Sequence, residues 1–239
     1  MTAPGGLTAR DVAAHYDAAY YADLAARYRR RTRFARQRIR NVFALLPVLR
    51  GRSVLDLGCG VGTFAVEAAR RGAWAVGLDP AAAALEAARA VAGAEGVEGA
   101  RFVRAEAERI PFAAESFDVV IAADVTEHLD DATLSAALAE VARVLRVGGV
   151  LVLYTPAPSH LFERLRARGF LLAPDPSHIG LRPAGVLAER VRCAGLEVVQ
   201  VRYLPSHVPG WRWLEWALGR WVGLLRRRIG IVARKGGGG

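Results

Sequence analysis

The chain has 239 residues, 53% of them hydrophobic, which suits one α/β domain with a sizeable core or, with less room, two small domains. The first thirty residues carry charges throughout, and no uninterrupted apolar run reaches the roughly 18 residues that a membrane span needs, so we expect neither a signal peptide nor a transmembrane helix. Cys59 and Cys193 lie far apart and give no disulfide framework, so we expect a cytoplasmic protein.

The net charge of +10 comes almost entirely from arginine. Two segments concentrate it. They are Arg226 to Arg228 and the set Arg27, Arg29, Arg30, Arg31, Arg33, Arg36, Arg38 and Arg40. The clusters allow an acidic partner, whereas a solvated helix face or an arginine-rich codon bias explains them without one.

At the N-terminus, the sequence predicts one or two helices over residues 8–46. Their aromatic and apolar face is made by Tyr16, Tyr20, Tyr21, Leu24 and Tyr28. From Ser53 onward, apolar runs of strand length alternate with stretches rich in alanine and leucine. The expected strands are 53–57, 74–79, 101–105, 117–124 and 149–155, and the expected helices are 63–71, 81–91 and 132–145. This alternation predicts βαβ units and a parallel sheet with helices on both faces.

After Thr155 the pattern loosens into proline-rich loops, followed by a helix near 183–194 and strands at 196–204 and 230–234. We therefore expect an α/β fold with a Rossmann-like, doubly wound seven-stranded sheet, mostly parallel with one antiparallel strand. The expected organisation is a helical N-terminal cap (1–47), one domain (48–235) with an amphipathic tryptophan-rich insertion (204–228), and a flexible tail (236–239).

The strongest local signal is VLDLGCGVGTF, in which a strand passes through Gly58, Gly60 and Gly62 into a helix that opens at Thr63. Glycines let the backbone turn tightly and approach a bound nucleotide. Asp79 ends the next strand, where a carboxylate can accept both ribose hydroxyls of an adenosine. The spacing is G-x-G-x-G, and Thr63 occupies the place of the third glycine of a dinucleotide loop, which disfavours a nicotinamide-dependent oxidoreductase.

These motifs resemble those of the class I S-adenosylmethionine-dependent methyltransferases, and the resemblance covers roughly residues 40–203. It extends to RFVRAEAERIPF, SFDVVIAADVTEHL and RVLRVGGVLVLYTP, which are similar to the family's third, fourth and fifth strand motifs. It implies S-adenosylmethionine as cofactor and S-adenosylhomocysteine as product. The cofactor-binding residues that it implies are Asp56, Gly58, Cys59, Gly60, Gly62, Asp79, Pro80, Glu106, Ala107, Ala123 and Asp124, with Tyr16 from the N-terminal cap.

Within that resemblance, Asp56 would hold the cationic amino group of the methionine part. The negative charge of Asp56 would repel the pyrophosphate of a dinucleotide. Asp79 would bind ribose. Glu106 stands beside adenine where the family more often has Asp. Tyr16 matches the aromatic residue of the cap and can close over cofactor or acceptor.

His128 is the leading candidate for a general base, because it follows the fourth strand at the edge where open α/β sheets bind ligands. ADVTEHL resembles the Glu-x-x-Glu-His segment of the ubiquinone-biosynthesis O-methyltransferases, in which an acceptor phenol is deprotonated. His178 is a second candidate base. Some relatives hold a divalent cation on this segment, so Asp124, Glu127 and His128 form an alternative metal site, although our first expectation is no metal. A histidine that only caps a helix is also compatible with the sequence.

We expect methyl transfer to a small-molecule acceptor, at oxygen rather than carbon or nitrogen, by a monomer or homodimer. The segment lacks the Asn/Asp-Pro-Pro-aromatic motif of amino-methylating DNA enzymes, so we do not expect nucleic acid as a substrate. Residues 211–228 predict an amphipathic helix that could meet the inner face of a membrane, a hydrophobic acceptor or the protein's own core. A membrane-associated, non-catalytic cofactor-binding protein is the rival outside enzymes.

Overall fold

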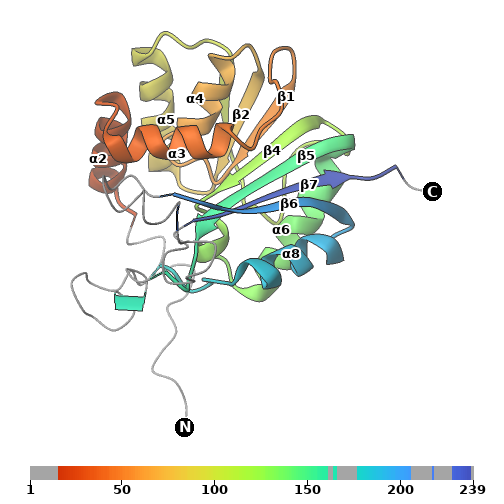
Figure 1. Cartoon of the computed structure of the whole chain (residues 1–239). Coiled ribbons are helices and arrows are strands. Elements are labelled where there is room, and N and C mark those ends of the chain that lie inside the picture. Colours follow the sequence, from red (N-terminus) through yellow and green to blue (C-terminus); the bar gives the residue numbers. More distant parts are fainter. Residues whose placement is uncertain (1–15, 161–163, 166–176, 206–216, 218–227, 238–239) are drawn as a thin grey trace.

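The computed structural model describes residues 16–160, 164–165, 177–205, 217 and 228–237 (Figure 1). The strands are β1 (Ser53–Leu57), β2 (Trp74–Asp79), β3 (Ala100–Arg104), β4 (Phe117–Ala123), β5 (Leu145–Pro156), β6 (Leu196–Leu204) and β7 (Arg228–Lys235). The helices are α2 (Ala18–Arg29), α3 (Arg33–Phe43), α4 (Thr63–Ala69), α5 (Ala82–Ala94), the short 3₁₀ helix η1 (Thr126–His128), α6 (Asp131–Val144) and α8 (Ala184–Cys193).

The seven strands form one sheet in the order β3-β2-β1-β4-β5-β7-β6. β7 runs antiparallel to both β5 and β6, while the β1–β2, β1–β4, β2–β3 and β4–β5 pairs are parallel. The predicted mostly parallel, doubly wound sheet with one antiparallel strand is therefore confirmed. The chain moves outward from β1 to β3 and then returns to β4 on the other side of β1, so the topological switch point lies between β1 and β4.

Helices cover both faces of the sheet, and each face has its own core (Figure 1). On one face, Leu134 and Leu138 of α6 and Leu187 of α8 pack on a sheet surface that includes Leu55 and Leu151. On the other face, Val42 at the end of α3 and Phe64 of α4 pack with Val54, Val119 and Val152. Because both faces are covered, the central strands are apolar on both sides, which explains the continuous apolar runs in their sequences.

Two helices, α2 and α3, form the part of the N-terminal cap that the structure describes. Asp17 caps α2 by accepting the N–H of Tyr20 at 2.8 Å, and Thr32 caps α3 by accepting the N–H of Ala35 at 3.3 Å. Tyr28 is buried and its hydroxyl donates to Glu67 of α4 at 2.9 Å, which ties the cap to the domain. Tyr21 is also buried, but Tyr20 is 42% exposed, so the predicted aromatic face is only partly in the core.

Some of the expected features lie outside the described residues. They include residues 8–15 of the cap, nearly all of the tryptophan-rich insertion and the end of the glycine tail. The proposed division at residue 47 stays a prediction. Among the residues that the structure does describe, no helix is long and apolar enough to cross a membrane.

The glycine loop offers a direct test of the fold. Gly62 has a φ of +74°, and a Cβ there would lie 2.7 Å from Cε1 of Phe102. Gly62→Ala should destabilise the protein by about 2 to 4 kcal/mol, the sum of the left-handed backbone cost and overpacking. Urea denaturation would measure it.

The matched control is Gly93→Ala in α5, where the added methyl group would meet nothing within 4 Å apart from its chain neighbours and the backbone of its own helix. It should stabilise the protein by about 0.5 to 1 kcal/mol, since alanine suits a helix better than glycine. Equal effects of the two substitutions would contradict the loop conformation described here.

Candidate active site

The glycine loop lies at the carboxyl edge of the sheet, next to the switch point. Gly58, Gly60 and Gly62 all have positive φ, as the motif requires. Asp56 is buried, and its Oδ2 accepts the N–H of Ala65 in α4 at 2.9 Å. Burial raises the pKa of Asp56 to about 7, although that N–H opposes the rise. Cys59 is buried and free, and its N–H donates to the carbonyl of Leu78 at 2.9 Å.

Asp79 is joined directly to this loop. Its Oδ2 accepts the N–H of Gly60 and its Oδ1 accepts the N–H of Ala81, both at 2.9 Å. The side chain is buried, and burial raises its pKa against these two N–H donors. The structure thus brings together the loop after β1 and the acid after β2, although 19 residues separate Gly60 from Asp79.

The other residues expected near adenine and ribose lie at the ends of β2 and β3. Pro80 is exposed and its carbonyl accepts Nε of Arg104 at 2.9 Å. Glu106 is exposed, and partial burial with the carboxylates of Glu108 and Asp79 raises its pKa. Ala107 is half-buried and packs against the main core. Their roles toward a nucleoside stay predictions.

Helix α2 lies over the glycine loop. Leu24 approaches Gly60, and Tyr21 clusters with Val61 of the loop and Ala84 of α5. Burial and the nearby carboxylate of Asp79 raise the pKa of the Tyr21 hydroxyl. Tyr21 is therefore part of the roof of the site, a position that its helical spacing alone did not reveal.

The end of β4 carries a half-buried anion between two cations. Ala123 is buried, and Asp124 has an unusual φ of +57°. Arg38 of α3 contacts the Asp124 carboxylate at 2.6 Å, and Arg228 of β7 contacts its other oxygen. Burial alone would raise the pKa of Asp124, but Arg228 and Arg38 hold it below its usual range.

Glu127 lies three residues after Asp124, and its pKa shifts in the opposite direction. It is buried, and its Oε2 accepts the Thr155 hydroxyl at 2.8 Å. Burial and the negative charge of Asp124 raise the pKa of Glu127 well above its usual range. The proton in this part of the site therefore belongs to Glu127, and the negative charge belongs to Asp124.

His128 is oriented by the loop that precedes α8. Its Nδ1 lies 3.0 Å from the carbonyl oxygen of Ser177. Because a carbonyl only accepts, Nδ1 carries the proton in this arrangement and Nε2 remains a proton acceptor. The Tyr16 hydroxyl lies 2.7 Å from Oγ of Ser177, and its ring meets the His128 ring edge-on at 5.8 Å between centroids.

The same loop brings His178 to the site, with its ring centroid 5.2 Å from that of His128. Arg182 fastens the loop by donating to the carbonyls of Thr126 at 2.9 Å and Leu129 at 2.8 Å. Gly180 donates its N–H to the Glu127 carbonyl at 2.8 Å, and a Cβ at Gly180 would lie only 2.2 Å from the Leu129 carbonyl oxygen. The close approach explains glycine at this position.

Three potential metal ligands therefore meet, but they are not the three that the sequence suggested. One ligand atom each of Glu127, His128 and His178 lies within 4.8 Å of the others. Asp124 is ion-paired with Arg38 and Arg228 instead. Two imidazoles and one carboxylate are a donor set that suits a divalent transition-metal ion.

Four functional positions were missed at the level of sequence. Ser177 acts through its backbone carbonyl, which no residue pattern encodes, and Thr155 and Arg182 act through tertiary contacts. Arg38 was one of eight clustered arginines with nothing to separate it from its exposed neighbours. The positive φ of Asp124 and its two cationic partners appear only when β4, α3 and β7 are assembled.

A glycine loop with an acid after β2, at the switch point of a doubly wound sheet, defines a nucleoside-binding α/β protein. A methyltransferase-domain family model matches residues 54–149. The ubiquinone biosynthesis O-methyltransferase of Neisseria meningitidis is 35% identical over 172 residues, which cover 67% of this chain and 70% of the relative.

Other curated relatives are matched over less of their length, and this chain spans about two fifths of the following one. An uncharacterized methyltransferase of Mycobacterium sp. strain JLS is 41% identical over 103 residues, 43% of this chain but only 38% of the relative. The structure of a SAM-dependent methyltransferase from Aquifex aeolicus shares the fold, with a TM-score of 0.67, 15% identity, and coverage of 91% of this chain and 98% of that one. The chain belongs to the S-adenosylmethionine-dependent methyltransferases.

Asp79 provides the sharpest test of the expected cofactor contacts. Asp79→Ala removes charge-assisted hydrogen bonds of roughly 1.5 to 3 kcal/mol each, so affinity for S-adenosylhomocysteine should fall at least about tenfold. Titration calorimetry with S-adenosylmethionine, S-adenosylhomocysteine and NAD would measure it. Asp118→Ala, at a carboxylate distant in the chain that pairs with Arg146, is the matched control. Unchanged affinity in Asp79→Ala would refute the ribose role.

The pKa of Asp56, about 7, gives a pH dependence with a defined sign. Below pH 7 the free protein keeps this carboxyl protonated, and an approaching ammonium group must first displace that proton. Affinity for S-adenosylhomocysteine should therefore fall by roughly fivefold to tenfold between pH 7.5 and 6. Calorimetry in two buffers of different ionisation enthalpy would detect the proton released. An equally steep profile in Asp56→Asn would assign the effect to another group.

Proposed function

We propose that this chain transfers the methyl group of S-adenosylmethionine to a hydroxyl group of a small-molecule acceptor. The observation that carries the proposal is His128, held at the carboxyl end of β4 with Nδ1 on the Ser177 carbonyl and Nε2 left to accept a proton. The resemblance of ADVTEHL to a ubiquinone-biosynthesis segment and the names of the relatives support oxygen over carbon or nitrogen as the methylated atom. Phenol-like acceptors fit this class best.

The bound cofactor supplies an activated methyl group, so the chain's own residues need to align, desolvate and deprotonate the acceptor. With S-adenosylmethionine bound, the methyl group would pass to the acceptor oxygen as the carbon–sulfur bond breaks, and the electrons of that bond would stay on sulfur. His128 Nε2 takes the hydroxyl proton. Tyr16 and Tyr21, on the roof over the glycine loop, exclude water from the reacting groups.

Cofactor binding is assigned to the loop from Asp56 to Gly62, to Asp79 and to Arg38. Arg38 places a guanidinium beside this loop, 5.1 Å from the ring centroid of Phe64 in the following helix, and we assign it to the cofactor's carboxylate. Asp124 would then keep Arg228 as its remaining cation. Both cysteines are free and Cys193 is exposed, which supports the expected reducing, cytoplasmic location.

A second proposal follows from the cluster of Glu127, His128 and His178. These residues would hold a divalent cation, which would polarise an acceptor oxygen and favour its deprotonation. His128 would then serve as a ligand and not as the base. The two proposals make different predictions for His178 and for chelation.

The test measures methyl transfer to a panel of phenols and catechols, with S-adenosylhomocysteine affinity as a second readout. If His128 is the base, His128→Gln should lower kcat by about 10² to 10⁴ with unchanged cofactor affinity, and chelation should have no effect. If the cluster holds a metal, both His128→Gln and His178→Gln should lose methyl transfer. Chelator would then abolish activity, and an added divalent cation would restore it.

Full activity in His128→Gln would overturn both proposals. The protein could instead bind the cofactor and methylate no acceptor, with or without an added divalent cation. That result would favour a non-catalytic cofactor-binding protein.

A further inference from the structure

The cap carries a long stretch of chain without a negative charge. Between Asp23 and Asp56 there is no acidic residue, and ten arginines stand in this interval. Such an imbalance cannot be neutralised within the segment. Any neutralising groups must come from the rest of the fold or from a partner.

Ion pairs among the described residues neutralise three of the ten. Arg31 pairs with Glu67 and Glu95, Arg38 pairs with Asp124, and Arg27 pairs with Asp23 just before the segment. The other seven are exposed, and none has an ion pair within the part of the chain that the structure describes. They are Arg29, Arg30, Arg33, Arg36, Arg40, Arg50 and Arg52.

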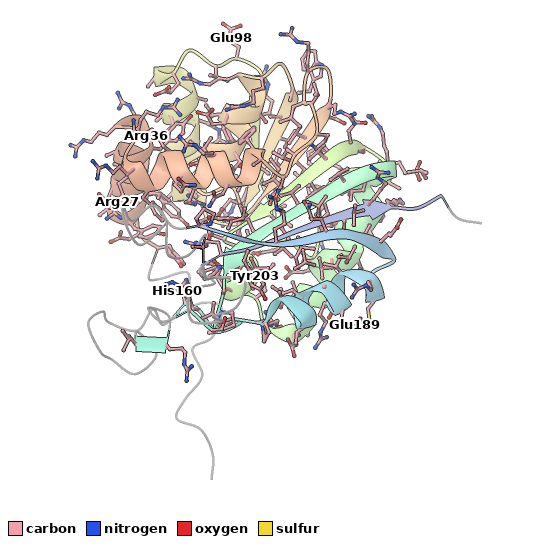
Figure 2. All side chains as sticks on the ribbon, in the orientation of Figure 1. Arg27, Arg36, Glu98, His160, Glu189 and Tyr203 are labelled. Atoms are coloured by element: carbon pink, nitrogen blue, oxygen red, sulfur yellow. The ribbon has the colours of Figure 1, made fainter. Side chains whose placement is uncertain are left out.

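Helix α3 explains how these arginines share a surface. Arg33, Arg36 and Arg40 are spaced by three and four residues, so they follow one stripe of the helix. The opposite stripe holds the buried Ile39 and Val42. Arg27 and Arg36 both project outward from the side of the molecule formed by α2 and α3 (Figure 2).

Two exposed apolar side chains adjoin the last of these arginines. Val48 is 79% exposed and Trp74 is 74% exposed. The backbone N–H of Trp74 donates to the Arg52 carbonyl at 2.8 Å, and a Cβ at Gly72 would lie 3.4 Å from the Arg50 side chain. Arg50 and Arg52 therefore lie close to the start of β2, where Trp74 is exposed, and residues 44–52, which include Val48, join this edge of the sheet to the end of α3.

We propose that this basic surface, made by the seven arginines with Val48 and Trp74, docks the protein on a bilayer of anionic phospholipids. The arginines complement the lipid phosphates, and each cation near such a surface strengthens binding by about fivefold. An indole and a branched aliphatic side chain suit the boundary between headgroups and acyl chains. A nucleic-acid backbone would use the arginines but would offer nothing to Val48, so the apolar rim favours the bilayer.

The test is vesicle co-sedimentation of the full chain, with phosphatidylglycerol vesicles against phosphatidylcholine vesicles. Wild type should bind the anionic vesicles and lose binding as salt rises. Arg33→Gln/Arg36→Gln/Arg40→Gln should lose on the order of 100-fold in affinity. Trp74→Ser should weaken binding severalfold.

The matched control is Arg89→Gln/Arg109→Gln/Arg192→Gln, which removes the same net charge from exposed positions elsewhere. It should retain binding to within a few fold, and all variants should keep S-adenosylhomocysteine affinity, which shows that they fold. Equal losses in the two triple variants would reduce the effect to net charge and overturn the proposal. So would no binding by wild type, full binding by the α3 triple variant, or binding of RNA in preference to vesicles.

Discussion

The pairing of Asp124 with Arg38 and Arg228 is the constraint around which this site is built. It joins the N-terminal cap, the end of β4 and the start of β7 through one half-buried carboxylate. An ion group that is largely removed from solvent contributes little net stability, but removing one partner leaves a poorly compensated charge. Its value lies in fixing α3 to the end of β4 and in holding Asp124 in a backbone conformation that non-glycine residues rarely adopt.

The same pairing sets the charges of the neighbouring groups. Burial raises the pKa of Glu127, and the negative charge of Asp124, ionised between two guanidiniums, raises it further. Buried acids elsewhere in the site, Asp56 and Asp79, also have raised pKa values. These acids favour a cationic ligand, because its positive charge would stabilise their ionised forms in place of the water that burial excludes.

Much of this arrangement could be predicted from sequence because it depends on local patterns. β1, β2 and β4 were recognisable from apolar runs, since strands covered on both faces alternate little. Gly58, Gly60 and Gly62 were recognisable because their backbone conformation is nearly closed to other residues. Asp79 followed from its place after the second strand of the same βαβ unit. Each of these inferences needed no more than about 30 contiguous residues.

What sequence could not supply was the pairing of distant side chains. Neither Tyr16 nor His178 has a local pattern that places it near His128, and the Ser177 carbonyl belongs to every residue type alike. Asp124 was expected among metal ligands from its spacing to Glu127 and His128, and its two arginine partners come from residues 38 and 228. A contact between residues 104 positions apart, such as Asp124 and Arg228, has no signature in the local spacing of either segment.

The family match divides the residues of the candidate site along the chain. The matched family region, residues 54–149, contains Asp56, Asp79, Asp124 and His128. Tyr16, Ser177, His178 and Arg228 all lie outside it, on the cap, on the loop before α8 and at the start of β7. The family match therefore includes the glycine loop and Asp79, which we expect to hold the methyl donor, together with His128, whereas several groups that we expect around an acceptor lie in the part of this chain that the match leaves out. Likeness to a ubiquinone O-methyltransferase consequently argues more strongly for the donor than for the acceptor, and the acceptor must be sought through the side chains around His128.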